Sequence, residues 1–175
     1  MPEDIFDIVN ERDEVVGRER RSYVHSNKLL HRSAQVLIFC DTNEGRKILL
    51  QKRSKLKDKH PLLYTASCSG HVDSGESYDE GAVREMREET GIECSADQLS
   101  KIGKIEASEG TGWEFAFVYV FFCDFDTKFS FSPDEVDSLK WVSISEFERI
   151  LRQEPQTCTP VFASVYDFYL SKTKK

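Results

Sequence analysis

The chain has 175 residues, of which 39% are hydrophobic, so it can form a buried core and is not a wholly disordered protein. Its 31 acidic residues outnumber its 24 basic residues, and the net charge of −7 argues against a protein that binds nucleic acid or an anionic membrane nonspecifically. Its five cysteines are far apart and form no C-x-x-C motif, which argues against a zinc knuckle or a disulfide framework. We expect one domain over residues 1–175, without a signal peptide and in the cytoplasm.

In the first half of the chain the residue pattern favours strands. Residues 5–9 and 15–17 flank a polar turn and predict a hairpin within about residues 1–20. Further strands are predicted at residues 35–41, 47–52 and 65–69. Residues 53–61 indicate a basic loop, whereas the polar residues 18–32 show no clear period. The longest apolar run, residues 115–123, is too short to span a membrane.

The second half alternates strands with helices. Strands are predicted at residues 102–106, 114–125 and 140–143, and helices at residues 78–89, at 146–152 and from Thr159 onward. Ser77 and Glu80 have the spacing of a capping box at the start of the first helix, and Gly91 is placed to end it. A chain that mixes strands with a few helices indicates an α/β sandwich.

The first of these helices has an unusual acidic side. At 100° per residue, Glu85, Glu88 and Glu89 fall on the side opposite the apolar Ala82 and Met86. Carboxylates one turn apart repel each other, yet their oxygens can together bind one hard cation such as Mg²⁺, which typically links carboxylates to substrate phosphates. The alternative interpretation is a solvated acidic helix face, which is the more common meaning of such clusters when they stand alone.

The residues around this helix form a longer pattern, G-x5-E-x7-R-E-U-x-E-E-x-G-U, in which U is bulky and aliphatic. Its positions are occupied by Gly70, Glu76, Arg84, Glu85, Met86, Glu88, Glu89, Gly91 and Ile92. The pattern over residues 70–92 resembles the Nudix box at every position. The resemblance implies an α/β/α sandwich with a mixed sheet, in which the box is a loop–helix–loop.

The resemblance also implies an activity and a set of site residues. Nudix enzymes are hydrolases that cleave a pyrophosphate bond in a nucleoside diphosphate linked to another group, X, by attack of water on phosphorus. By position, Glu85 and Glu89 would be metal ligands, Glu88 a metal ligand or the catalytic base, and the Gly70 carbonyl a further ligand. Arg84 would tie the loop to the helix and belong to the catalytic set. The implied cofactor is Mg²⁺, with Mn²⁺ as an alternative, and the implied partner is a small nucleotide or other diphosphate.

Three flanking segments, residues 30–33, 50–54 and 69–71, resemble the branch that contains isopentenyl diphosphate isomerases and their hydrolase relatives. Those isomerases use a second metal centre, and four residues here stand near its positions: His25, His31, His71 and Glu114. His25 and His31 are one residue closer together than that branch implies, so His25 is the weakest of the four. These histidines are either a second metal site or ordinary hydrogen-bonded residues.

The residues that perform isomerisation in that branch are replaced in this sequence. Ser69 stands in place of the catalytic cysteine, Ala116 in place of a second glutamate, and Val161 in place of a tryptophan. We therefore expect a hydrolase. The alternatives are an isopentenyl diphosphate isomerase-like enzyme and a nucleotide-binding module without activity.

Substrate-binding and accessory residues are also suggested. In the basic loop, Arg53 and Lys57 resemble a diphosphate-binding pair, and Arg32 is a third candidate. Outside the helix, Glu114 and Glu135 are alternative bases, together with the neighbouring Asp134 and Asp137. Three aromatic residues, Trp113, Phe115 and Phe117, either stack on a nucleobase or belong to the core. A homodimer through the N-terminal hairpin is a further possibility.

Overall fold

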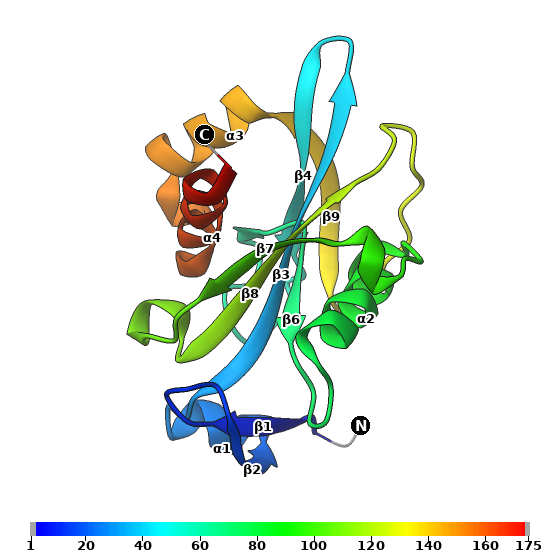
Figure 1. The fold of residues 1–175 in the computed structure, drawn as a ribbon. Coiled ribbons are helices and arrows are strands. Elements are labelled where there is room, and N and C mark those ends of the chain that lie inside the picture. Colours follow the sequence, from blue (N-terminus) through cyan, green and yellow to red (C-terminus); the bar gives the residue numbers. More distant parts are fainter. Residues whose placement is uncertain (1–2, 174–175) are drawn as a thin grey trace.

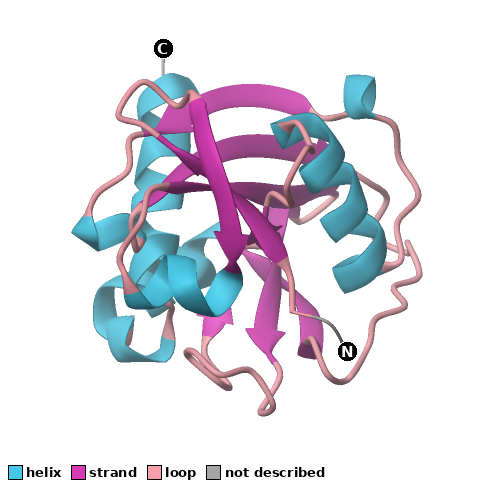
Figure 2. Ribbon diagram, turned by 90° about the horizontal axis from the view of Figure 1, so that it is seen from below, coloured by secondary structure: helices cyan, strands magenta, loops and turns pink. Residues whose placement is uncertain are grey.

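A computed structural model describes residues 3–173 of the chain. A mixed sheet is enclosed by α2 (Tyr78–Thr90) on one face and by α3 (Ile144–Gln153) and α4 (Pro160–Thr173) on the other (Figure 1). Figure 2 shows the same strands from below, with helices on both sides of them. The fold is therefore the α/β/α sandwich that the sequence predicts.

The strands of this sheet are β3 (His31–Thr42), β4 (Gly45–Arg53), β5 (Tyr64–Thr65), β6 (Cys68–His71), β7 (Ser100–Ile105), β8 (Glu114–Phe122) and β9 (Val136–Ser143). Their order is β5-β4-β3-β8-β7, with β6 also paired to β3 and β9 to β4. The central pair β3–β8 is parallel and the other pairs are antiparallel, so the sheet is mixed. Within residues 3–173, three short 3₁₀ helices lie in the connections: Ala96–Gln98, Glu109–Thr111 and Pro155–Thr157.

Strand β3 supplies both halves of the core because successive side chains point to opposite faces. Leu37 and Phe39 belong to the cluster under α3 and α4, whereas Val36 and Ile38 belong to the cluster under α2. A run of apolar residues is thus needed on a strand that is covered on both sides.

The paths of β3 and β4 open a space between these two strands, within the sheet. The two strands pair only at the end of the hairpin that joins them, where Phe39 is opposite Ile48. Farther on, the start of β3 pairs with β6, while the end of β4 pairs with β5 and β9. The strands therefore diverge, and residues from β3, β4, β5 and β6 line a common cavity.

Local signals fix the ends of α2. The Ser77 hydroxyl accepts a hydrogen bond from the Glu80 amide, and the Glu80 carboxylate accepts one from the Ser77 amide at 2.8 Å, which is a complete capping box. Gly91 ends the helix with φ of 74°, and a Cβ there would lie 2.6 Å from the Ser130 carbonyl oxygen. The predicted helix is confirmed, with its last turn extending to Thr90.

The predicted N-terminal hairpin is a separate two-stranded sheet of β1 (Ile5–Val9) and β2 (Val15–Arg20), followed by α1 (Arg21–Ser26). Residues 1–2 of the predicted hairpin region lie outside the described residues. Asp13 in its turn joins it to the main body, since its carboxylate accepts hydrogen bonds from Arg32 Nε at 2.6 Å and Tyr78 Oη at 2.9 Å. The hairpin therefore holds α1 beside the sheet.

Several predicted boundaries differ from the structure. The predicted strand 65–69 is two strands, separated by the buried Ala66 and Ser67. Strand β8 ends at Phe122, before the predicted end at residue 125. Strand β9 begins at Val136, before the predicted start at residue 140, because β9 pairs along most of β4. Within residues 3–173, no helix combines the length and apolarity that crossing a bilayer requires.

Candidate active site

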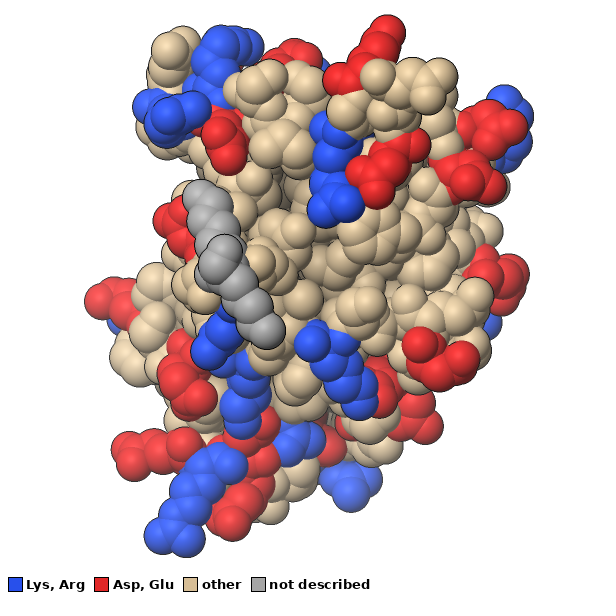
Figure 3. Space-filling view, turned by 45° about the horizontal axis from the view of Figure 1, so that its top comes forward, with Lys and Arg blue, Asp and Glu red and all other residues tan. Residues whose placement is uncertain are grey.

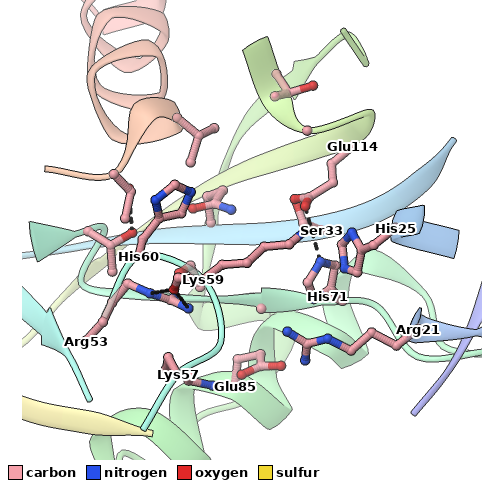
Figure 4. A pocket seen from close by; sticks show the side chains of 18 of the residues that line it. Arg21, His25, Ser33, Arg53, Lys57, Lys59, His60, His71, Glu85 and Glu114 are labelled. Carbon is pink, nitrogen blue, oxygen red and sulfur yellow. Dashed lines mark hydrogen bonds and ion pairs between the residues drawn. The ribbon is translucent and has the colours of Figure 1, made fainter. Parts of the chain in front are cut away.

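A cavity of about 520 Å³ lies where β3 and β4 diverge. Figure 4 shows its layout: Arg53, Lys57 and His60 on one side, His25, His71 and Glu114 on the other, and Glu85 below. A cavity of this size accommodates a nucleotide-sized ligand. Its two ends differ in chemistry, because one holds the α2 carboxylates and the other holds the histidines.

The acidic end is formed where α2 packs against β6. The side chain of Glu85 is only 13% exposed, and Glu89 is 1% exposed. A Cβ placed at Gly70 would overlap the Glu85 carboxylate, so any other residue there would displace that carboxylate from the β6 backbone. The structure therefore brings Gly70, Glu85 and Glu89 together, as the sequence pattern implies.

Buried hydrogen bonds hold the Glu89 carboxylate in place. Gln51 Nε2 donates to Glu89 Oε2 at 2.9 Å, and the Ser69 amide donates to the same oxygen at 2.8 Å. The Gln51 side chain is fully buried, so this donor cannot turn away into solvent. Burial raises the pKa of Glu89, while these two donors act to lower it. The sequence pattern did not indicate Gln51 as part of this site.

The acidic end is electrostatically strained without a cation. Burial and the negative charge of Glu89 raise the pKa of Glu85 to about 8, against the opposing effect of Arg84. Carboxylate oxygens with a nearby backbone carbonyl are the donor set that Mg²⁺ and Mn²⁺ prefer. A divalent cation would remove the repulsion, so these residues fit the implied cofactor.

Arg84 connects the loop and the helix. Its Nε and Nη2 donate to the two oxygens of Glu76 at 2.9 Å each, and Nη2 also donates to the His71 carbonyl at 2.8 Å. Its Nη1 donates to Glu85 Oε1 at 2.6 Å and to Glu88 Oε2 at 3.4 Å. The Glu88 side chain is 47% exposed, so it lies at the mouth of the acidic end.

Two of the three predicted phosphate-binding cations line the cavity. Arg53 donates from Nε and Nη2 to the Lys59 carbonyl at 3.3 and 3.2 Å, and Lys57 forms an ion pair with Glu135. Burial lowers the pKa of both Arg53 and Lys57, and Glu89 opposes that effect. Both cations therefore lie close enough to the carboxylates to interact with them.

Arg32, the third candidate, lies elsewhere. Successive side chains of a strand alternate in direction, so Arg32 points away from the face that His31 and Ser33 present. Its guanidinium is bound to Asp13 and lies 5.4 Å from the centre of the Tyr78 ring. The structure thus differs from the expectation for Arg32, which attaches the hairpin and does not line the cavity.

The other end of the cavity is a cluster of histidines. Ligating nitrogens of His25, His31 and His71 all lie within 4.8 Å of one another. Glu114 Oε1 lies 3.2 Å from His71 Nε2 and 3.6 Å from His31 Nε2. The Phe6 ring stacks on His71 with 4.6 Å between centroids, which holds the imidazoles in place. Helix α1 thus brings His25 to the others despite its short spacing in the sequence.

The buried environment of this cluster suits a metal ion. Buried Nε2 atoms of His25 and His31 have no hydrogen-bond partner among the described residues. Burial, with the charge of His71, lowers the pKa of His25 to about 3, and burial also lowers the pKa of His71. A neutral imidazole is the form that binds metals, so the donor set fits a borderline transition metal with Glu114 as a fourth ligand.

Both alternative bases, Glu114 and Glu135, are paired with basic side chains. Burial acts to raise the pKa of Glu114, but His71 and His31 outweigh it and lower that pKa. Glu135 is paired with Lys57 at the cavity wall. Of the predicted aromatic candidates, Phe115 is buried, and Phe117 packs against Tyr119 with 4.9 Å between centroids. These two rings belong to the packed interior of the protein.

The structure also shows where the three residues lie that replace the isomerase cysteine, tryptophan and second glutamate. Ser69 and Val161 line the cavity, whereas Cys68 is fully buried in the core under α2. Cys68 and Ser69 therefore point to opposite faces of β6, as successive residues of a strand do. Ala116 lies beside Ser33 on the paired strand and adds no carboxylate to the histidines.

Comparison with known proteins agrees with this geometry. Residues 30–161 match the NUDIX domain family. A Clostridium acetobutylicum protein named an uncharacterized Nudix hydrolase is 33% identical over 158 residues, which cover 86% of this chain and 75% of that protein. The isopentenyl-diphosphate Delta-isomerase of Nocardia farcinica is 33% identical over 163 residues, which cover 92% of this chain and 91% of that enzyme.

A solved structure leads to the same conclusion about the fold. The crystal structure of a Deinococcus radiodurans protein matches with a TM-score of 0.74 and 26% identity, over 95% of this chain and 99% of that one. The family match spans β3 to the start of α4 and includes the acidic helix with its glycine. The chain therefore belongs to the Nudix family.

Proposed function

We propose that the protein is a Mg²⁺-dependent hydrolase that cleaves the pyrophosphate bond of a nucleoside diphosphate linked to X. The observation that supports this most strongly is the pair of buried carboxylates, Glu85 and Glu89, packed against the backbone of Gly70 inside a cavity with cations on its wall. Buried like charges of this kind are unfavourable unless a bound cation neutralises them or one carboxylate takes up a proton.

The three carboxylates divide into two metal ligands and one base in the proposed reaction. Glu85 and Glu89, with the Gly70 carbonyl, would hold the metal, and a bound Mg²⁺ would supply charge neutralisation at the pyrophosphate oxygens and a more acidic water. Glu88 is the most exposed of the three and accepts the proton of the attacking water. Arg84 keeps Glu85 and Glu88 in position through the hydrogen bonds from its Nη1.

The cationic wall binds the substrate phosphates. Arg53 presents a fork suited to two phosphate oxygens, and Lys57 exchanges its ion pair with Glu135 for a phosphate oxygen. This exchange would release Glu135, which is why it remains the alternative base. On the face in Figure 3, basic and acidic side chains of the described residues are interspersed, as suits a small anionic substrate better than a nucleic-acid backbone.

The direct test is product formation from a panel of nucleoside diphosphates, triphosphates, nucleotide sugars and dinucleotides, with Mg²⁺ and with EDTA. We expect Mg²⁺-dependent release of two phosphorus-containing products or of a monophosphate and phosphate. Reaction in ¹⁸O-water identifies the phosphorus that is attacked. Tight nucleotide binding without turnover would instead support a module that only binds.

The second candidate is an isopentenyl diphosphate isomerase-like activity. The histidine cluster with Glu114 and the similarity to the Nocardia enzyme favour it. Ser69 in place of a thiol and Val161 in place of a tryptophan oppose it, because proton transfer and carbocation stabilisation lack their groups. Incubation with isopentenyl diphosphate and analysis for dimethylallyl diphosphate separates the two, and clear isomer formation overturns the hydrolase proposal.

A further inference from the structure

Two polar side chains on β3 are buried in the cavity wall, and each has an oxygen without a hydrogen-bond partner among the described residues. Ser33 is 1% exposed and Gln35 is 5% exposed, and both line the cavity. Among the described residues, none donates to or accepts from the Ser33 Oγ, and none donates to the Gln35 Oε1. In Figure 4, Ser33 lies on the β3 ribbon that runs behind the cavity.

These side chains are costly where they stand. A buried polar atom without a hydrogen bond destabilises the folded protein, and most such atoms in folded proteins are paired. On the same face of β3, the next positions are Leu37 and Phe39, which pack in the core under α3 and α4. The strand therefore changes from apolar to polar at the point where it enters the cavity, which points to a ligand as the missing partner.

A second pair of hydroxyls extends the same wall. Thr65 and Thr159 are buried and line the cavity, and Thr159 Oγ1 donates to Thr65 Oγ1 at 3.2 Å. The Thr65 hydroxyl proton then remains available for another acceptor. Ser33, Gln35 and Thr65 are neutral, so this wall differs from the charged wall of Arg53 and Lys57.

We propose that Ser33 and Gln35 form a subsite for a neutral hydroxyl- or N–H-bearing organic group that is joined to the diphosphate of the substrate. The Gln35 Oε1 can only accept, so its partner is a donor such as a sugar hydroxyl or an amide or amino N–H. The Ser33 Oγ can donate and accept, which suits a hydroxyl. This inference rests on the proposed function, because the diphosphate end of the ligand is the part that the acidic helix holds.

The subsite would discriminate against ligands that lack a hydrogen-bonding group. A site built to hydrogen-bond a hydroxyl or N–H disfavours a ligand that lacks it, because the buried protein atoms stay unpaired in that complex. Diphosphates with a polar organic group are therefore preferred over bare diphosphates and over diphosphates of purely hydrocarbon alcohols.

The experiment is calorimetric binding of two non-hydrolysable probes in Mg²⁺, α,β-methylene-ADP and methylenediphosphonate, to the full-length protein. The variants are Ser33→Ala and Gln35→Leu, and the control is Ser100→Ala on the exposed start of β7. We expect each variant to weaken α,β-methylene-ADP binding roughly tenfold and to leave methylenediphosphonate binding unchanged. The control should match the wild type for both probes.

Thermal unfolding distinguishes this role from a structural one. Removal of a buried, unpartnered hydroxyl should leave the Tm of Ser33→Ala equal to or above that of the wild type, even if Gln35→Leu is less stable. Unchanged nucleotide affinity in Ser33→Ala would show that only water fills the site and would overturn the proposal, as would equal losses for both probes.

The wild-type protein separates the two proposals. If it binds methylenediphosphonate but does not prefer the nucleotide, the subsite is refuted while the proposed hydrolase stands. If it binds neither probe and hydrolyses nothing in the panel, the proposed function fails and the subsite fails with it.

Discussion

Strand β6 contributes to both ends of the cavity, with Gly70 at the acidic end and His71 at the histidine end. The potential metal ligands at the two ends are nevertheless of different kinds. The acidic end offers carboxylate and carbonyl oxygens, while the histidine end offers three nitrogens and one carboxylate. Hydrogen bonds from Gln51 and Ser69 orient the Glu89 carboxylate, whereas the stacked Phe6 ring orients the imidazoles.

Because their ligand atoms differ, the two ends suit different metal ions. Oxygen ligands prefer hard cations such as Mg²⁺, and imidazoles prefer borderline ions such as Zn²⁺ or Co²⁺. Hydrolysis of a pyrophosphate bond needs charge neutralisation at phosphate oxygens, which is the chemistry of the acidic end. We therefore assign the reaction to the acidic end, and four predictions test that assignment.

The largest effect is expected for Glu89→Gln. Loss of this buried ligand charge should lower Mg²⁺-dependent hydrolysis by more than about a hundredfold, because the metal loses its best-anchored ligand. Circular dichroism should show an intact fold and a Tm at or above that of the wild type, since a repelling charge has been removed. The matched control is Glu93→Gln on the surface after α2, and near-normal turnover of Glu89→Gln would refute the metal role of this helix.

The next effect is a pH dependence of stability at the acidic end. The raised pKa of Glu85, about 8 against an ordinary value of 4.5, means that the folded metal-free protein holds this proton more tightly than the unfolded chain does. Its stability should therefore fall as the pH rises between these values, and Glu85→Gln should gain about 4 kcal/mol over the wild type by pH 8. Urea unfolding in EDTA at pH 5, 6.5 and 8 measures this, and parallel curves would contradict it.

A smaller effect is expected for the cationic wall. Arg53→Ala should raise the KM for the diphosphate substrate roughly tenfold and change kcat much less, because Arg53 binds the ground state and the transition state alike. Arg46→Ala provides the control, since Arg46 pairs with Asp41 at the distant end of the β3–β4 hairpin. An equal fall in kcat and kcat/KM, or a lost fold, would show that Arg53 instead supports its loop through Lys59.

The smallest effect on hydrolysis is expected at the histidine end. His25→Gln should remove one bound equivalent of Co²⁺, measured by its visible absorption, and should leave Mg²⁺-dependent turnover nearly unchanged. His60→Gln is the control, because His60 lines the cavity outside the cluster. If turnover fell in proportion to Co²⁺ binding, the two ends would act as one catalytic centre and the comparison would no longer hold.

The two ends also differ in how far the sequence predicted them. The acidic end lies within residues 70–92, and its signals are local: Ser77 and Glu80 start the helix, Gly91 ends it, and the helical period groups the carboxylates. The buried donor Gln51 was missed, because its contact with Glu89 depends on how β4 passes over α2. Local periodicity carries no information about such a contact.

The histidine end was only partly predicted, because its residues come from α1, β3, β6 and β8. His25 had the weakest signal, since its approach to the others depends on the hairpin that Asp13 attaches to the sheet. The same attachment explains why Arg32 is occupied with Asp13. Likewise, the sequence pattern of Ser33 and Gln35 is that of ordinary strand residues, and only the divergence of β3 and β4 places them in the cavity wall.

The most direct measurement is anomalous diffraction from crystals grown with Mn²⁺ and α,β-methylene-ADP. We predict an anomalous peak coordinated by Glu85, Glu89 and the Gly70 carbonyl, with the phosphates of the nucleotide bound to the same ion. A map in which these carboxylates turn into solvent while the phosphates bind elsewhere would contradict the account.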